Sequence, residues 1–114
     1  MHIEELIGIV EGEVIQLGDP AENTVERAFA SDMMSDVLTL STDSLLLITG
    51  MANMQTIRTA EMAEIKNILF VRGKKPTQEM LQLARHEQIN LFATRKSMFA
   101  TCGELHKAGL KPVY

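Results

Sequence analysis

The residues best suited to binding chemistry follow the most apolar segments of this 114-residue chain. Polar stretches there carry glycines, hydroxyl groups and basic side chains, at residues 49–53, 72–76 and 94–97. Basic side chains and the free N–H groups of a helix start both favour anions. One interpretation is therefore a phosphate or nucleotide site, whose candidate residues are Thr49, Gly50, Asn53, Arg72, Gly73, Lys74, Thr94 and Arg95. The alternative is that the glycines only turn the chain and the basic groups are solvated.

Known phosphate-binding motifs do not accompany these stretches. The segment RGKKPT, residues 72–77, contains Gly-Lys without the GxxxxGK[ST] spacing of a P-loop. Residues 8–12 do not form a GxGxxG motif either. ATP hydrolysis and phosphoryl transfer are therefore not expected, and the chain is predicted not to be an enzyme.

Metal-binding and nucleophilic residue types are few and scattered. His2, His86 and His106 have no spacing that would place them on one metal-binding face, and the last two are expected on the surface. Cys102 is the single cysteine, so it cannot alone hold a structural zinc or an iron–sulfur cluster. Its place on an apolar helical stripe predicts a buried structural thiol. We expect no metal and no cofactor.

A repeated Ser-Asp pair is the other local feature, formed by Ser31-Asp32 and Ser35-Asp36. Ser31 can cap a helix that begins at Asp32, where the carboxylate would favour the helix dipole, and Asp36 would follow one turn later. Two aspartates at this spacing could also hold a divalent cation or serve an enzyme, but two carboxylates alone are weak support for either. We therefore favour the structural interpretation.

The elements that must position the polar stretches are repeated strand–helix units. Apolar strands are predicted at residues 45–49, 68–72 and 91–94, and Leu45, Ile68 and Leu91 recur at a step of 23 residues, as do Gly50 and Gly73 (73 − 50 = 23). Each is followed by an amphipathic helical pattern. This alternation predicts an α/β fold with a mostly parallel sheet built from βα units, in two or three layers.

The apolar stripes of the three helices are expected to face the core. Their predicted members are Met51, Met54, Ile57 and Met62, then Met80, Leu81 and Ala84, then Met98, Phe99, Cys102 and Leu105. Ser97 is expected to cap the third helix and Gly109 to end it.

Before these units, the pattern predicts a short helix over residues 3–10 that ends near Gly12, because apolar residues recur there at helical spacing. A strand at 13–17, a turn at 18–20 and a strand at 25–30 should follow. The length predicts a single domain over residues 1–114.

Composition excludes several function classes. The net charge of −4 argues against nucleic acid as the main partner. No apolar run is long enough to span a bilayer, no secretory signal is recognisable, and one cysteine suits a reducing compartment. We therefore expect a cytoplasmic protein without a membrane partner.

Three phrases together resemble the DRTGG domain family: ASDMMSDVL (30–38), TGMANMQTIRTAEM (49–62) and ILFVRGKKPTQEMLQLARHEQINLFAT (68–94). Matches to the family's Ser/Gly-Asp-Leu-Leu-Ser-Asp-Val phrase are Ser31, Asp32, Ser35, Asp36 and Val37, with methionines where leucines are usual. Thr49, Asn53, Gly73 and Pro76 fit the later motifs. One departure is that Arg27-Ala28 stands where the family's Gly-Gly should fall, which alters any close backbone approach that those glycines allow.

The resemblance implies a regulatory rather than a catalytic role. DRTGG domains are similar to the N-terminal domain of HPr kinase/phosphorylase and occur beside CBS domains in family II pyrophosphatases, where they help to form a dimer interface near a regulatory nucleotide. The leading expectation is thus a non-catalytic homodimeric module that binds an anionic small molecule or nucleotide. The alternative is a protein–protein adaptor for a redox (hydrogenase-type) or metabolic enzyme complex. An enzyme that uses Asp32 and Asp36 is the least favoured interpretation.

Overall fold

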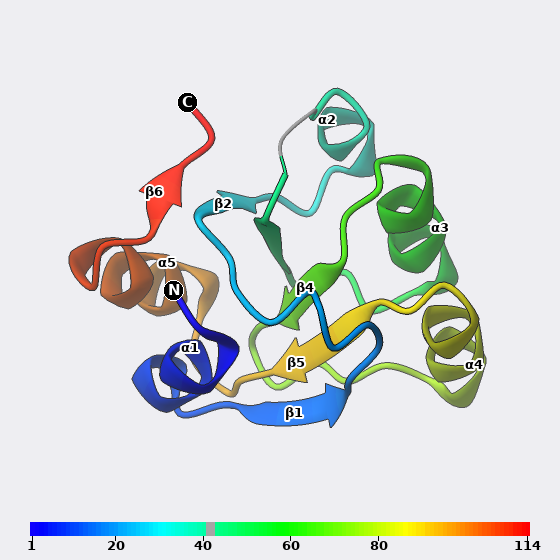
Figure 1. Ribbon diagram of the computed structural model, residues 1–114, viewed down its shortest axis with the longest axis horizontal. Helices are drawn as coiled ribbons and strands as arrows, with labels where there is room; N and C mark the ends of the chain where they lie inside the picture. The colour runs from blue at the N-terminus through cyan, green and yellow to red at the C-terminus, as the bar shows by residue number, and fades with distance from the viewer. Residues whose placement is uncertain (41–42) are drawn as a thin grey trace.

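The computed structural model describes residues 1–40 and 43–114 (Figure 1). In chain order the elements are α1 (Ile3–Val10), β1 (Glu13–Gln16), β2 (Arg27–Ala30), α2 (Met34–Val37), β3 (Leu45–Thr49), α3 (Met54–Met62), β4 (Asn67–Phe70), α4 (Gln78–His86), β5 (Asn90–Ala93), α5 (Met98–Lys107) and β6 (Lys111–Pro112). The predicted N-terminal helix is confirmed: it ends at Val10, and its C-cap residue Glu11 has a left-handed conformation, one residue before Gly12.

The strands form one sheet in the order β1-β5-β4-β3-β2-β6. The three predicted central strands are parallel neighbours, as expected, although β4 and β5 each begin and end one or two residues earlier than the apolar pattern indicated. β2 and β6 continue the parallel part, whereas β1 pairs antiparallel with β5. The predicted mostly parallel α/β fold is therefore confirmed.

Helices cover both faces of the sheet, which makes three layers (Figure 1). Alternating side chains of β3 show the division: Leu45 and Leu47 pack with α3 and α4, while Leu46 and Ile48 pack with α1 and α5. Every residue of β3, β4 and β5 is buried. Strands covered on both faces are apolar without interruption, because each face meets a helix layer.

The 23-residue step has a direct structural meaning for β4 and β5. Ile68 pairs with Leu91 in the parallel register, and Asn67 pairs with Asn90 at the first position of each strand (90 − 67 = 23). β3 is offset, since Leu47 rather than Leu45 lies opposite Ile68. The repeat therefore reports true register for one strand pair only.

Two members of the predicted apolar stripes do not face the core. The side chain of Phe99 is 88% exposed and that of Met62 is 66% exposed. Phe99 directly follows Met98, which packs against the core, and Met62 directly precedes Ala63, which also packs against it, so both exposed side chains lie beside the buried stripe of their helix. Both predictions were wrong because apolar residue type was taken to mark the buried stripe, whereas the stripe also contains the buried threonines Thr56, Thr59 and Thr101.

Among residues 1–40 and 43–114, no helix combines the length and the hydropathy that crossing a bilayer requires.

Candidate functional site

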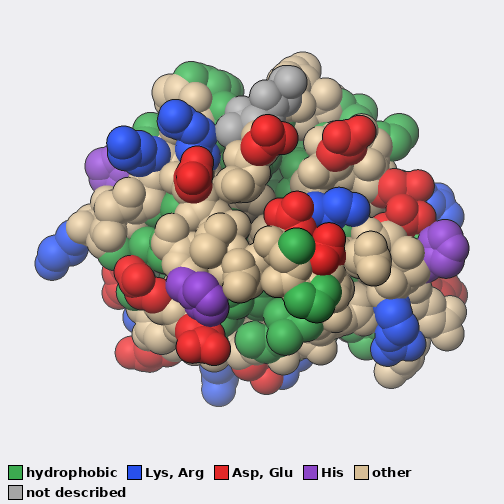
Figure 2. Space-filling view, viewed as in Figure 1, with side chains coloured by type: hydrophobic (Ala, Val, Ile, Leu, Met, Phe, Trp, Pro, Cys, Tyr) green, Lys and Arg blue, Asp and Glu red, His purple; other side chains and the backbone are tan. Residues whose placement is uncertain are grey.

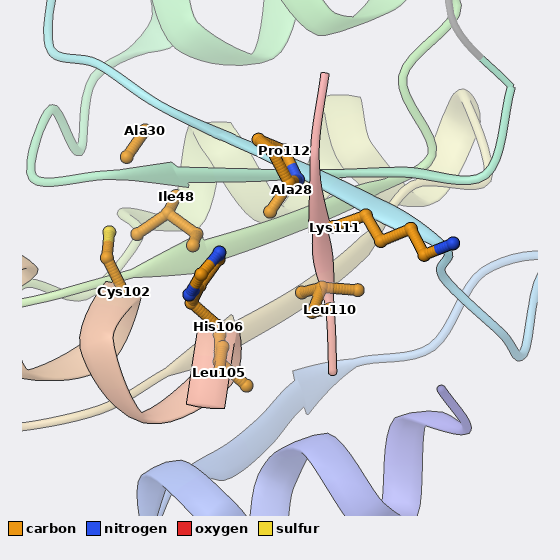
Figure 3. A pocket seen from close by; sticks show the side chains of 9 residues that line it. All are labelled: Ala28, Ala30, Ile48, Cys102, Leu105, His106, Leu110, Lys111 and Pro112. Atoms are coloured by element: carbon orange, nitrogen blue, oxygen red, sulfur yellow. The ribbon is translucent and has the colours of Figure 1, made fainter. Parts of the chain in front are cut away.

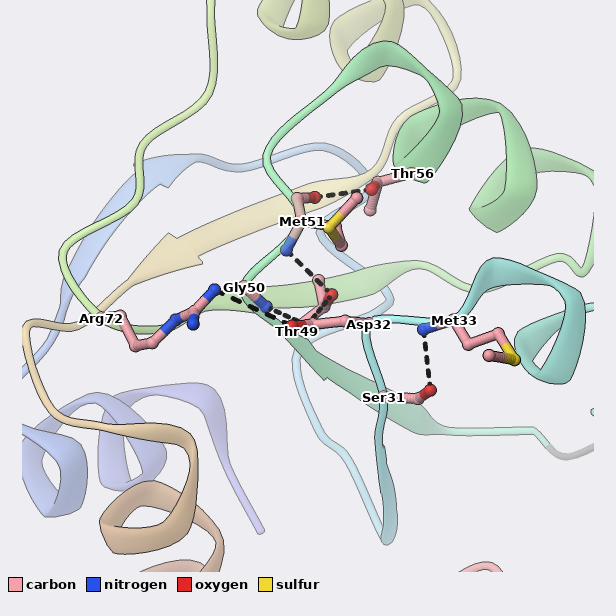
Figure 4. Close-up of polar contacts among 8 residues, drawn as sticks. All are labelled: Ser31, Asp32, Met33, Thr49, Gly50, Met51, Thr56 and Arg72. Atoms are coloured by element: carbon pink, nitrogen blue, oxygen red, sulfur yellow. Dashed lines mark hydrogen bonds and ion pairs between the residues drawn. The ribbon is translucent and has the colours of Figure 1, made fainter.

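The carboxylate of Asp32 is the centre of a polar cluster at the carboxyl end of β3 (Figure 4). Its Oδ1 atom accepts hydrogen bonds from the Thr49 hydroxyl at 3.0 Å and from the Gly50 N–H at 2.7 Å. Its Oδ2 atom lies 3.8 Å from a guanidinium nitrogen of Arg72. Three of the predicted anion-binding residues therefore surround an anion that belongs to the chain itself.

This role of Asp32 replaces the predicted helix start. The Ser31 Oγ atom accepts a hydrogen bond from the Met33 N–H at 2.9 Å, which turns the chain before the helix. α2 begins only at Met34, and its N-cap residue Met33 makes no side-chain cap. The prediction of a helix from Asp32 was wrong because the Thr49 hydroxyl, the Gly50 N–H and the Arg72 guanidinium hold the carboxylate at the end of the sheet. Asp32 and Asp36 thus do not share one helix.

Arg72 reaches this cluster because its own backbone is left-handed and because residue 50 is a glycine, which has no side chain. Its φ angle is 62°, in the left-handed region where non-glycine residues are uncommon, and Gly73 follows at 74°. The Arg72 guanidinium lies over the buried backbone of Gly50, so that any side chain at position 50 would overlap it. Gly50 is therefore required for the close approach of the arginine rather than for its own conformation.

The loops after β4 and β5 are joined by backbone hydrogen bonds. The Arg72 N–H donates to the Lys96 carbonyl at 2.9 Å, and the Gly73 N–H donates to the Thr94 carbonyl at 3.0 Å. Thr94 in turn donates its hydroxyl to the Val10 carbonyl at 2.7 Å. The convergence of the strand ends that the sequence predicted is thus present for the 72–74 and 94–96 loops.

A hollow of about 260 Å³ lies beside these joined loops. Gly73, Thr94 and Arg95 line it, together with Lys75 and residues 11–13. Lys75 is paired with Glu13 at 2.7 Å. Lys74 and Arg95 are exposed and form no ion pair with any residue in 1–40 or 43–114. The hollow thus has both acidic and basic side chains at its margin, Glu11 and Glu13 beside Lys75 and Arg95. There is open space above Gly73, where an added side chain would meet nothing.

The helix starts that follow the strands are already capped. Asn53, Thr77 and Ser97 each accept, through their side-chain oxygen, a hydrogen bond from the backbone N–H three residues later. The prediction that Ser97 caps the third helix is confirmed. Asn53 therefore acts in this structure as the N-cap of α3. Its Oδ1 atom accepts hydrogen bonds from both the backbone N–H and the hydroxyl of Thr56.

Cys102 lies in a different hollow, between α5 and the edge of the sheet (Figure 3). Ala28, Ile48 and His106 also line this hollow of about 190 Å³. The prediction of a buried thiol was wrong, because Cys102 is only partly buried. The small side chain of Ala28 leaves a hollow beside it that no other side chain in the described ranges fills. Ala28, one of the two residues found where the DRTGG resemblance predicts Gly-Gly, thus forms part of a cavity wall.

Burial raises the pKa of the Cys102 thiol above its ordinary value of 9.0. The folded state favours the neutral thiol, so alkylation by iodoacetamide at mildly alkaline pH should be several-fold slower in the folded protein than in urea. By linkage, this group should leave the free energy of unfolding unchanged below pH 9.0 and lower it as pH rises above that value. Equal alkylation rates in the two states would contradict the burial described here.

Within the described ranges, no group of three or more His, Cys, Asp or Glu side chains is placed to hold a metal ion.

Comparisons with known proteins support the fold. No protein-family model matches the sequence, and a search of curated proteins finds no match. Among solved structures, the fold is similar to that of the CBS and DRTGG domains of the regulatory region of a Clostridium perfringens pyrophosphatase, in complex with its activator diadenosine tetraphosphate, with a TM-score of 0.77 and 13% sequence identity. The match covers 91% of this chain and 45% of that one, so this chain spans less than half of that regulatory region. The expected resemblance to DRTGG-containing proteins is therefore supported at the level of the fold.

Proposed function

We propose that this protein is a non-catalytic regulatory module whose strand carboxyl ends bind an anionic small molecule of the nucleotide or phosphate class. The observation that carries the proposal is the pair of backbone hydrogen bonds that hold Arg72 and Gly73 against the 94–96 loop, which brings Arg72 and Arg95 to one edge of the sheet. In open α/β sheets, ligands bind beyond the carboxyl ends of the strands. The similar fold in a regulatory region solved with a nucleotide activator gives further support.

Asp32 has a specific place in this proposal, because it occupies the position that a ligand phosphate would take. A phosphate that reached the Gly50 N–H and the Arg72 guanidinium would compete with the Asp32 carboxylate for both. Displacement of the Asp32 carboxylate would also move the start of α2, since only the N-cap residue Met33 separates Asp32 from that short helix. Ligand binding would in this way be coupled to the position of α2.

The surface around α2 is our candidate for a homodimer contact. Met33 is 60% exposed and Leu38 is 48% exposed, on either side of a helix that packs against α3. Exposed methionines form adaptable apolar surfaces that suit protein contacts. A dimer through this surface would bring the ligand-coupled helix α2 to the subunit interface. Light scattering of the wild type and of a Leu38→Asp variant tests it, and a monomer mass for the wild type at high micromolar concentration would contradict it.

Thermal denaturation with a panel of nucleotides and phosphates tests the ligand proposal. A ligand that binds only the native state raises the melting temperature with its concentration. We expect selective stabilisation by a phosphate-containing compound, and no effect from its dephosphorylated nucleoside. A panel without any selective shift would favour the second candidate function.

A Gly50→Ala substitution should separate binding from stability. The new methyl group would push the flexible Arg72 head group away, so the free energy of unfolding should change by less than about 1 kcal/mol. Ligand stabilisation should nevertheless decrease, because Arg72 would no longer lie over the Gly50 N–H. Gly103→Ala is the matched control, since a side chain there meets nothing within contact distance. Equal ligand stabilisation of the two variants would contradict the role of Arg72.

The second candidate function is an adaptor that docks on another protein without a ligand. The observation that favours it is the exposure of several large apolar side chains, of which Phe99 and Tyr114 are about nine-tenths exposed.

A further inference from the structure

A second surface with the features of a binding site lies near the amino end of β5, whereas the polar cluster around Asp32 lies at the carboxyl end of β3. α1, the end of β1 and the loop over residues 18–23 enclose a hollow of about 590 Å³ beside Asn90, the first residue of β5. Its apolar lining includes Ile7, Val14 and Leu17. The Leu17 side chain is 66% exposed, which leaves it available to a partner. β1 is also an edge strand, which pairs only with β5 among the strands of residues 1–40 and 43–114.

The walls of this hollow are held in place by buried polar contacts. The side chain of Asn90 is 1% exposed; its Oδ1 atom accepts from the Gly18 N–H at 2.6 Å, and its Nδ2 atom donates to the Glu22 carbonyl at 2.9 Å. The Ile3 N–H donates to the Asn23 carbonyl at 3.0 Å, which joins α1 to the same loop. The hollow is thus formed before any partner arrives, so a partner would not have to order it.

The charge around this hollow is of one sign. Glu4, Asp19 and Glu22 line it, and no Lys or Arg is among its described lining residues. In the part of the chain that the structure describes, none of these three carboxylates is paired with a Lys or Arg. His2 also lines the hollow, and its Nδ1 atom accepts a hydrogen bond from the Glu4 N–H at 3.2 Å. Figure 2 shows hydrophobic side chains low on this face of the molecule, with acidic side chains and histidine beside them.

We propose that this hollow docks a segment of a partner protein in which apolar side chains are flanked by Lys or Arg. The apolar lining would take up the apolar side chains, and the three unpaired carboxylates would meet the flanking cations. A second copy placed by two-fold symmetry would instead set Glu4, Asp19 and Glu22 against their own equivalents, which like-charge repulsion opposes. The proposal does not depend on the ligand site, since one surface lies at the amino end and the other at the carboxyl ends of the parallel strands.

Amide NMR titration with three synthetic peptides tests the proposal. The first peptide alternates Leu with Lys, the second replaces each Lys by Glu, and the third replaces each Leu by Ser. We expect only the first to shift resonances, and the shifted amides should lie in residues 2–7 and 14–23. A Leu17→Ser variant should weaken binding about tenfold, whereas Phe99→Ser, which removes an exposed apolar side chain on α5, should leave it unchanged.

A charge-matched pair of variants tests the carboxylates. Glu4→Gln, Asp19→Asn and Glu22→Gln together should weaken the Lys peptide several-fold, and more so at low salt. The control neutralises Glu61, Glu64 and Glu79, which are exposed on or after α3 and α4. Equal effects of the two triple variants, tight binding of the Glu peptide, or shifts confined to other surfaces would overturn the proposal. Self-association of the wild type that Leu17→Ser abolishes would also overturn it, because a second copy would then fill the hollow.

Discussion

Replacement of Asn90 by alanine should lower the free energy of unfolding by about 3 kcal/mol. The buried Asn90 amide makes three contacts in one place: it accepts from the Gly18 N–H and donates to the Glu22 carbonyl and to the Asn67 side-chain oxygen. Alanine removes all three bonds and leaves the partner groups unsatisfied in a buried region, where each unmade bond is costly. Urea denaturation monitored by circular dichroism measures the change.

Two further variants show whether the loss comes from these bonds. Asn23→Ala removes an exposed amide from the same loop and should change stability by less than about 0.5 kcal/mol. Asn67→Ala removes only the Asn67–Asn90 bond and should fall between the other two. A similar small loss for Asn90→Ala and Asn23→Ala would show that the Asn90 network adds little, and that loop 18–23 is held by other contacts.

Removal of the Asp32 carboxylate should lower stability and raise anion affinity at the same time. Asp32→Ala leaves the Thr49 hydroxyl and the Gly50 N–H without their partner, which should cost about 1–2 kcal/mol because water can replace part of a half-exposed carboxylate. The same change frees the Arg72 guanidinium for an external phosphate. Phosphate or nucleotide binding should therefore become several-fold tighter in the variant, as measured by calorimetric titration.

Asp32→Asn is the matched variant for this prediction. An asparagine oxygen can still accept from Gly50, so most of the stability should return, while the loss of charge should keep the gain in anion affinity. Asp36→Asn, on the neighbouring helix α2, should change neither quantity. Anion affinity that falls or stays constant in both Asp32 variants would show that the carboxylate does not compete with the ligand.

Much of the fold could be predicted because its central strands are covered on both faces. Uninterrupted apolar runs such as Leu45–Thr49 have few alternatives once amphipathic helices follow each of them. The strand predicted at 13–17 is present as β1, but its pairing could not be predicted in the same way, and β6 was not predicted. β1 is a four-residue edge strand whose antiparallel direction depends on its partner, and β6 is a two-residue strand that includes a proline.

The polar contacts were harder to predict than the sheet. Asp32 looked like the first residue of a helix because its neighbours carry an apolar helical stripe, and its true partners lie 17 and 18 residues away in sequence. The Asn67–Asn90 pair left a usable signal, since asparagine opens two successive apolar strands at the 23-residue step. Polar residues at the start of buried strands need a partner, and the matching step identifies where that partner lies.

Calorimetric titration of ATP, diadenosine tetraphosphate and pyrophosphate into the wild type tests the central proposal most directly. We expect at least one of them to bind with a dissociation constant of roughly micromolar to millimolar magnitude, as two or three charge-assisted contacts would allow. Arg72→Ala and Arg95→Ala should each weaken that binding with little change in melting temperature, while Arg58→Ala on the exposed side of α3 should not. A wild type that binds none of the three, or strand-end variants that bind as tightly as Arg58→Ala, would contradict a ligand site at the carboxyl ends of the strands.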